Sequence, residues 1–230
     1  MGRTLSKAIA LTLAAGAFAA PAALAQELPG EFSGNIAYTT DYKYRGITQS
    51  GDGPAVSGGF DWSGGDFYVG TWASSIEFGD DTGVEIDYYA GYAPTVGAFD
   101  LDFGLLYYTY PDATDEPDEQ NFLEFYVGAG TSLAGLDLAA SFSYSDDFYG
   151  ADEEATYLNG SVGYGISDAI SVDAGVGFSS FDDGGSDDYT DYSVGATYSF
   201  EWADLDLRYI DTDRDGVDDD QIVFTVARSL

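Results

Sequence analysis

The acidic segment from Asp211 to Asp219 has the residue types and spacing of a calcium-binding loop. Asp211, Asp213 and Asp215 alternate along it, and a glycine follows them directly. In calcium loops of this kind, carboxylates at alternate positions converge on one hard cation and the glycine makes the sharp turn. The twelfth position is Ile222, where such loops carry a bidentate glutamate. The segment therefore predicts either a weak calcium site on Asp211, Asp213, Asp215 and Asp219 or an acidic loop that is only solvated.

Two residue types that most catalysts use are missing from the chain. It has no cysteine and no histidine. This excludes thiol nucleophiles, Cys-ligated metals and the usual forms of serine–histidine–carboxylate hydrolysis. A catalyst also needs a base that works near neutral pH, and no pair of carboxylates stands out from the general acidity. We therefore expect no enzyme, and no cofactor apart from the weak calcium considered above.

Acidic residues dominate the charge of the chain. There are 41 Asp and Glu against seven Lys and Arg, which gives a formal net charge of −34. Such a chain will not bind nucleic acid through bulk charge. Strongly acidic chains are often disordered, but disordered segments contain few aromatic residues, and aromatic residues make up 16% of this sequence. The chain should therefore fold.

The first 25 residues have the three parts of a secretion signal. Arg3 and Lys7 precede an apolar run from Ala8 to Ala20, and Ala23-Leu24-Ala25 forms a small-residue cleavage site. The apolar run is shorter than the roughly 18 to 20 residues that a membrane-spanning helix needs. We therefore expect export and cleavage after Ala25, with residues 26–230 forming one domain.

After Gln26 the dominant pattern is alternation with a period of two residues. Between Phe32 and Tyr44 the even positions are mainly apolar or aromatic and the odd positions are mainly polar. This pattern predicts a strand with two different faces, and it returns at residues 136–145 and 170–179. The polar face consists largely of Gly, Ser, Ala and acids. Such small residues fit a confined lumen better than bulk water.

About twelve such segments follow one another along the chain. Short connections alternate with longer acidic ones, and an even number of strands with this alternation is typical of bacterial outer-membrane barrels. We therefore predict an all-β, transmembrane, antiparallel up-and-down β-barrel of about twelve strands, with ten or fourteen as alternatives. The predicted strands begin near residues 32, 54, 67, 84, 99, 122, 136, 156, 170, 189, 205 and 221.

The alternation also predicts which charged side chains face the lumen. We expect Lys43 and Arg45 on the first strand to form a basic stripe with Arg208. The acids Glu85, Asp87 and Glu124 should lie nearly opposite. Inward acids outnumber inward bases, and carboxylate rings raise the local cation concentration; the alternative is that these groups only pair with one another and with water. The candidate pore-lining residues are Asp41, Lys43, Arg45, Glu85, Asp87, Asp100, Asp102, Glu124 and Arg208.

Several Tyr and Trp residues lie near the ends of the predicted strands. At these positions we expect an interfacial aromatic girdle in preference to a ligand-stacking surface. The residues are Tyr42, Tyr44, Trp62, Tyr92, Tyr144 and Trp202.

The run Thr40-Asp41-Tyr42-Lys43-Tyr44-Arg45-Gly46-Ile47-Thr48-Gln49-Ser50 resembles the opening motif of the TorF family of proposed porins, Ser-Asp-Tyr-x-Phe-Arg-Gly-Ile-Ser-Gln-Ser. The similarity continues at residues 54–55, 58–61, 67–74, 85–92 and 107–111. The later half of the chain fits as a pattern more than as a motif. The resemblance implies an outer-membrane location and a channel role, and it brings no catalytic residues and no known substrate.

We therefore expect a narrow outer-membrane diffusion channel for small solutes that favours cations. The alternative is a non-conducting structural or adhesive barrel whose acidic loops are bridged to lipopolysaccharide by divalent cations. The expected partners are outer-membrane lipid and lipopolysaccharide, the barrel-assembly machinery and small solutes, with no nucleic acid.

Overall fold

A computed structural model describes residues 30–79, 82–113, 120–182, 186–214 and 220–230 of the chain. The predicted signal peptide and its cleavage site lie outside these ranges. Asp215 and Asp219 of the predicted calcium loop also lie outside them.

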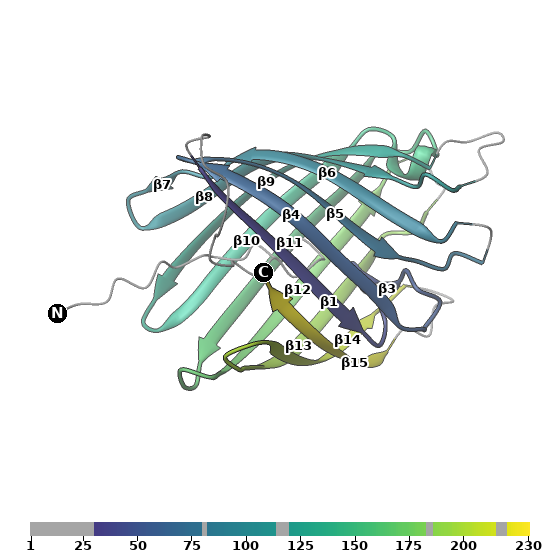
Figure 1. The fold of residues 1–230 in the computed structure, drawn as a ribbon. Coiled ribbons are helices and arrows are strands. Elements are labelled where there is room, and N and C mark those ends of the chain that lie inside the picture. The colour runs from purple at the N-terminus through teal and green to yellow at the C-terminus, as the bar shows by residue number, and fades with distance from the viewer. Residues whose placement is uncertain (1–29, 80–81, 114–119, 183–185, 215–219) are drawn as a thin grey trace.

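Strands make up nearly all of the regular structure (Figure 1). Besides the wall strands, the described residues form three two-residue strands, β2 (Lys43–Tyr44), β3 (Ile47–Thr48) and β7 (Thr95–Val96), and one short 3-10 helix, η1 (Phe148–Gly150). In the described ranges no helix is long and apolar enough to cross a membrane. The wall strands are β1 (Glu31–Thr39), β4 (Ala55–Gly64), β5 (Phe67–Ser75), β6 (Val84–Tyr92), β8 (Phe99–Thr109), β9 (Phe122–Leu133), β10 (Leu136–Ser145), β11 (Ala155–Gly165), β12 (Ile170–Phe181), β13 (Tyr189–Ser199), β14 (Asp204–Thr212) and β15 (Gln221–Ser229).

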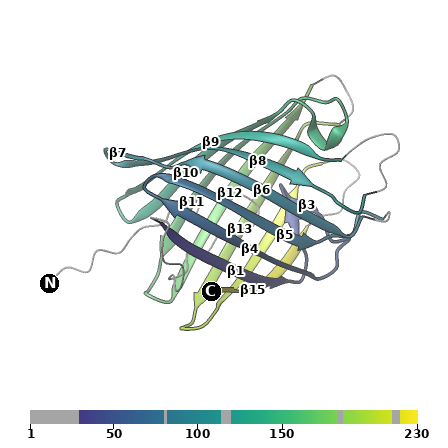
Figure 2. The ribbon, with the colours of Figure 1, turned by 45° about the horizontal axis from the view of Figure 1, so that its top comes forward.

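The wall strands close into a barrel (Figure 2). Each pairs antiparallel with the next one along the chain, and β1 pairs with β15, with Tyr38 opposite Val226. Closure leaves no free sheet edge, so every strand has a hydrogen-bonding neighbour on both sides. The prediction of a 12-strand up-and-down β-barrel is confirmed.

The two ends of the barrel differ in the length of their connections. The turns at one end are short, and Gly65 (φ +65°) and Gly135 (φ +85°) occupy left-handed positions there. The longer connections join the wall strands at the other end. Their described parts are residues 40–54, 76–79, 82–83, 110–113, 120–121, 146–154, 182, 186–188, 213–214 and 220. β1 starts at the short-turn end, and β15 runs toward that end and finishes with Ser229 beside Asn35 of β1.

The outer face of the barrel is apolar. Alternate residues of each strand point outward, and the exposed fraction of their side chains reaches 69% at Phe60 and 60% at Val194. Large apolar side chains are exposed in this way on every wall strand. A continuous apolar surface of this kind is expected where lipid replaces water as the solvent.

The lumen is filled on one side only. Trp72 of β5, Tyr108 of β8 and Tyr126 of β9 point inward and are buried in the main hydrophobic cluster. The strands across the lumen present small polar side chains such as Ser141 and Ser193. The expectation of an inward face made of small residues and acids is therefore incomplete for the β5–β9 side, where large aromatic rings stand among them. The inward position of Trp72 also settles the facing of β5, which the sequence pattern leaves open.

Glycines on neighbouring strands make room for these inward rings. Tyr126 lies directly opposite Gly104, and a Cβ atom at Gly104 would overlap the Tyr126 ring. Gly91 stands in the same relation to Tyr68 on the adjacent strand pair. The rings therefore lie flat along the barrel wall across the neighbouring strand.

The first strand is shorter than the alternation predicts. It ends at Thr39, and the residues that follow leave the wall. The alternation in the sequence nevertheless continues to Tyr44. The backbone between Thr39 and Tyr44 is again partly extended, and one face of this segment lies against aromatic rings. The prediction that Lys43 and Arg45 lie on the first strand is therefore wrong.

Candidate channel constriction

The segment Thr40–Gly53, here called the plug, folds back into the lumen from the long-loop end. Its centre is the hairpin of β2 and β3, which turns at Arg45 (φ +48°) and Gly46 (φ +85°). Two consecutive positive φ angles are typical of a two-residue hairpin turn. The tip of this hairpin reaches strand β13, where a Cβ atom at Gly46 would meet the side chain of Asp191.

Side chains of the plug bind the aromatic side of the wall. The Tyr42 hydroxyl donates to Glu85 Oε1 at 2.8 Å, and the Tyr44 hydroxyl donates to the Tyr108 hydroxyl at 3.4 Å. The Arg45 guanidinium forms an ion pair with Glu124, whose side chain is 1% exposed. The plug is thus fixed to β6, β8 and β9 by three successive polar contacts.

Polar contacts inside the plug centre on Asp41. Its Oδ1 accepts hydrogen bonds from Thr48 Oγ1 at 2.7 Å and from Ser50 Oγ at 2.8 Å, and its Oδ2 lies 3.0 Å from Lys43 Nζ. Ser50 Oγ in turn accepts from the Tyr42 backbone N–H at 2.9 Å. The buried carboxylate therefore ties the incoming and outgoing arms of the plug together.

The environment of the plug fixes the protonation of its side chains. Burial lowers the pKa of the Arg45 guanidinium, but the Glu124 carboxylate and the Tyr44 and Tyr108 hydroxyls together outweigh burial and leave that pKa raised. Burial and then the charge of Glu85 raise the pKa of Tyr42 well above its usual value. Arg45 therefore stays cationic and Tyr42 stays a neutral donor throughout the physiological range.

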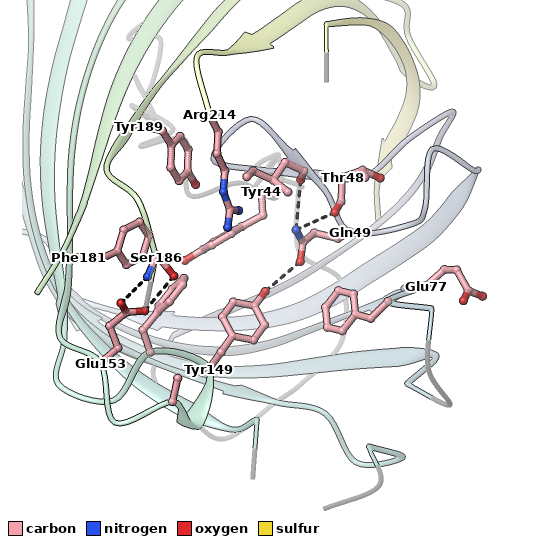
Figure 3. A pocket seen from close by; sticks show the side chains of 14 residues that line it. Tyr44, Thr48, Gln49, Glu77, Tyr149, Glu153, Phe181, Ser186, Tyr189 and Arg214 are labelled. Carbon is pink, nitrogen blue, oxygen red and sulfur yellow. Dashed lines mark hydrogen bonds between the residues drawn. The ribbon is translucent and has the colours of Figure 1, made fainter. Parts of the chain in front are cut away.

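Two cavities lie on either side of the plug. The inner cavity, here called the lumen cavity, has a volume of about 430 Å³ and is lined by wall residues such as Asn35, Ser161 and Arg208. The outer cavity, here called the vestibule, has a volume of about 520 Å³ and lies among the long connections (Figure 3). Tyr44 lines both cavities, so its side chain stands between them.

The structure brings several predicted site residues to this plug. Asp41, Lys43 and Arg45 belong to it, whereas Glu124 and Glu85 face it from the wall. Because Arg45 contacts Glu124 directly, the predicted separation of a basic stripe from opposed acids is wrong. Asp87, which follows on the same inward face of β6, is buried, and its Oδ1 has no hydrogen-bond partner among the described residues.

The remaining predicted site residues lie elsewhere in the lumen. Asp102 accepts from the Tyr68 hydroxyl at 2.7 Å, and Asp100 accepts from Thr95 Oγ1 at 2.7 Å near the short-turn end. Arg208 is paired on the far wall with Asp173 and with Asp206, the latter at 3.2 Å. That any of these residues lines a conducting path stays a prediction.

The assignment of Tyr42 and Tyr44 to an interfacial girdle is wrong. Both are 8% exposed and lie inside the barrel, where the Tyr42 ring packs against Trp72 with centroids 5.4 Å apart. Trp202 and Tyr92 are exposed on the outer face, as a girdle requires. The one sequence signal for the difference is the Arg-Gly pair that follows Tyr44, since glycine favours a tight turn.

The predicted calcium loop is described only in part. The Asp211 carboxylate accepts from the Tyr209 hydroxyl at 3.1 Å, and the Asp213 carboxylate accepts from the Thr190 backbone N–H at 2.5 Å. Within the described ranges no group of three or more acids is arranged to hold a metal ion. Calcium binding by this loop stays a prediction.

A closed barrel with an apolar outer face, a polar lumen and an inserted segment defines a protein with the fold of outer-membrane porins. It is similar to the KdgM porin, with a TM-score of 0.60 and 10% identity over 86% of this chain and 97% of that one. It is also similar to the COG4313 outer membrane channel from Pseudomonas putida F1, with a TM-score of 0.51 and 10% identity over 90% of this chain and 97% of that one.

The family of the chain follows from its sequence. Residues 23–229 match the family described as "Bacterial protein of unknown function (Gcw_chp)", and the chain belongs to it. No curated protein matches the chain significantly. At the identities above, the solved structures show a shared fold.

Proposed function

We propose that the protein is a narrow outer-membrane channel for small solutes that favours cations, without an enzymatic role. The observation that carries this proposal is the pair of cavities within one closed barrel, separated by the plug at Tyr44. A barrel whose only role is to display loops needs no such internal space. The resemblance of the plug sequence to the TorF motif supports the same role.

The charge of the lumen supports the preference for cations. Each of the three described basic residues that line the lumen cavity is already neutralised by a carboxylate, as in the pairs Lys43–Asp41 and Arg45–Glu124. Several further inward acids accept hydrogen bonds from neutral tyrosine hydroxyls, and a hydrogen bond from a phenol does not cancel a charge. These pairs are Asp61–Tyr89, Glu85–Tyr42, Asp102–Tyr68 and Asp191–Tyr157.

The proposed location follows from the two ends of the barrel. Short turns and chain ends would face the periplasm, and the long acidic connections would face the outside, as in single-chain outer-membrane barrels. This location implies contact with lipid, with lipopolysaccharide and with the barrel-assembly machinery. Recovery of the full-length chain from the soluble periplasm would contradict it.

The proposal is tested by the reversal potential of the refolded protein in a planar bilayer under a KCl gradient. We expect a reversal potential of the sign given by cation selectivity. Asp61→Asn should move it toward zero, because this change removes an inward carboxylate and leaves an oxygen that can still accept from the Tyr89 hydroxyl. Asp168→Asn, which removes the same charge from a short turn, is the matched control.

Two outcomes would contradict the proposal. Anion selectivity of the unmodified protein would refute the cation preference. A complete lack of conductance would favour the alternative, a non-conducting barrel that displays acidic loops.

A further inference from the structure

The vestibule is walled by aromatic rings. Phe78, Phe148, Tyr149, Phe181 and Tyr189 line it, together with Tyr44 at its floor (Figure 3). The rings hold one another in place, with Phe181 and Tyr189 stacked at a centroid distance of 6.2 Å. Aromatic walls of this kind offer large, rigid contact surfaces for a planar or apolar solute.

One cationic side chain points into this aromatic space. The Arg214 guanidinium lies over the Tyr189 ring, 5.5 Å from its centroid, and Figure 3 shows it extending between Tyr189 and Tyr44. Its backbone N–H is bound to Thr212 Oγ1 at 3.3 Å. The side chain is half-buried, and none of the described carboxylates forms an ion pair with it.

A guanidinium that forms no ion pair with a described carboxylate is unusual in so acidic a chain. Lys43, Arg45 and Arg208 all form ion pairs with carboxylates. Arg228, at the short-turn end, donates to the Trp202 carbonyl at 3.1 Å. Within the described part of the chain, Arg214 is therefore the basic residue whose guanidinium contacts only an aromatic ring. A guanidinium has five N–H donors and binds carboxylates in a two-pronged geometry.

The other polar groups of the vestibule have protein partners. Gln49 donates to the Ile47 and Thr48 carbonyls and accepts from the Tyr149 hydroxyl at 2.9 Å. Glu153 accepts from the Ser186 backbone N–H at 2.8 Å. Glu77, the other carboxylate of the lining, accepts from the Gly79 backbone N–H at 3.2 Å. The Arg214 guanidinium is therefore the cationic donor of the described lining that stays available to a solute.

We propose that the vestibule binds a small organic acid that carries a planar ring, with its carboxylate on Arg214 and its ring against the aromatic wall. The inference rests on the proposed function only in that the vestibule would be the outer entrance of the channel. The acidity of the chain disfavours the binding of every anion. Binding of the organic acid therefore needs both the ring contact and the guanidinium. A bare carboxylate such as acetate should therefore bind much more weakly than benzoate.

Benzoate is the probe for this site. Its affinity for the folded full chain in non-ionic detergent is measured by isothermal titration calorimetry, which requires no conduction. The loss of a hydrogen bond to a charged group typically weakens binding about tenfold or more, so Arg214→Gln should weaken benzoate binding at least tenfold. Arg228→Gln, which removes the same group at the opposite end of the barrel, should leave the affinity unchanged.

Two further arms make the test decisive. Phe181→Leu, which removes one ring of the wall, should weaken benzoate binding while Arg214 is intact. A heat-dependent shift on a gel checks that each variant is folded. Unchanged benzoate affinity in Arg214→Gln would overturn the proposal, as would the absence of benzoate binding to the unmodified protein. Tighter binding of benzylammonium than of benzoate would also overturn it, by showing an aromatic site for organic cations.

Discussion

At the scale of single residues, the ion pair of Arg45 and Glu124 holds the plug most directly. Both side chains are buried, and Arg45 also lies over the Tyr44 and Tyr157 rings at 4.7 and 4.3 Å. Removing one partner of a buried pair leaves an uncompensated charge and typically costs about 3–5 kcal/mol. We expect Glu124→Gln to lower the free energy of unfolding by about that much, as measured by urea titration in detergent.

The double variant Arg45→Met/Glu124→Leu separates the two contributions to this loss. Replacing a whole buried pair by apolar groups is often close to neutral. The double variant should therefore be more stable than Glu124→Gln alone. A double variant as unstable as the single one would show that the pair does not hold the plug through its charge.

The contact between Gly104 and Tyr126 leads to a second prediction at this scale. A Cβ atom at Gly104 would overlap the inward ring, and overpacking of this kind typically costs about 1–3 kcal/mol. Gly104→Ala should lower the free energy of unfolding by that amount in the same titration. Gly163→Ala is the control, because a Cβ atom there meets its nearest atom at 3.8 Å. Equal effects of the two substitutions would contradict the account.

At the scale of elements, the wall could be predicted from the sequence and the plug could not. Alternation with a period of two predicts which residues share a face of a strand. The prediction is correct for the wall strands because lipid on one face and the lumen on the other differ sharply in polarity. The same pattern runs on to Tyr44, since the plug also has an apolar and a polar side. Nothing in the alternation shows that the chain turns inward at Thr40.

The inward aromatic residues were hidden from sequence analysis for a related reason. In a partly filled barrel the inner face can be apolar, so Trp72 and Tyr68 oppose Phe67 and Val69 without a clear facing. The ion pairs of Lys43 and Arg45 could not be predicted from the sequence either. Which carboxylate each side chain meets depends on the path of the plug across the lumen.

The turn of the plug gives a prediction for this element. Gly46 combines a φ of +85° with close contact to Asp191, so Gly46→Ala should displace the hairpin. Lys43 and Arg45 should then become open to trypsin in the folded barrel. Gly79→Ala is the matched control, because Gly79 has a φ of +81° with nothing within 4 Å of the added atom. Resistance of Gly46→Ala to cleavage at both sites would count against the plug as described.

At the scale of the whole molecule, the fold combines an apolar exterior, an acidic lumen and an internal plug. The proposed path for solutes runs through both cavities, with the plug between them. Tyr44 is the side chain that both cavities share. The central claim is therefore that the barrel conducts and that the plug limits its conductance.

Single-channel conductance of Tyr44→Ala beside that of the unmodified protein tests this claim most directly. Truncation removes the ring between the vestibule and the lumen cavity, so we expect a small conductance for the unmodified protein and a larger one for Tyr44→Ala. Tyr107→Ala, which removes an outward-facing ring that is 42% exposed, should leave the conductance unchanged. Equal conductance of Tyr44→Ala and the unmodified protein, or none in either, would contradict the account.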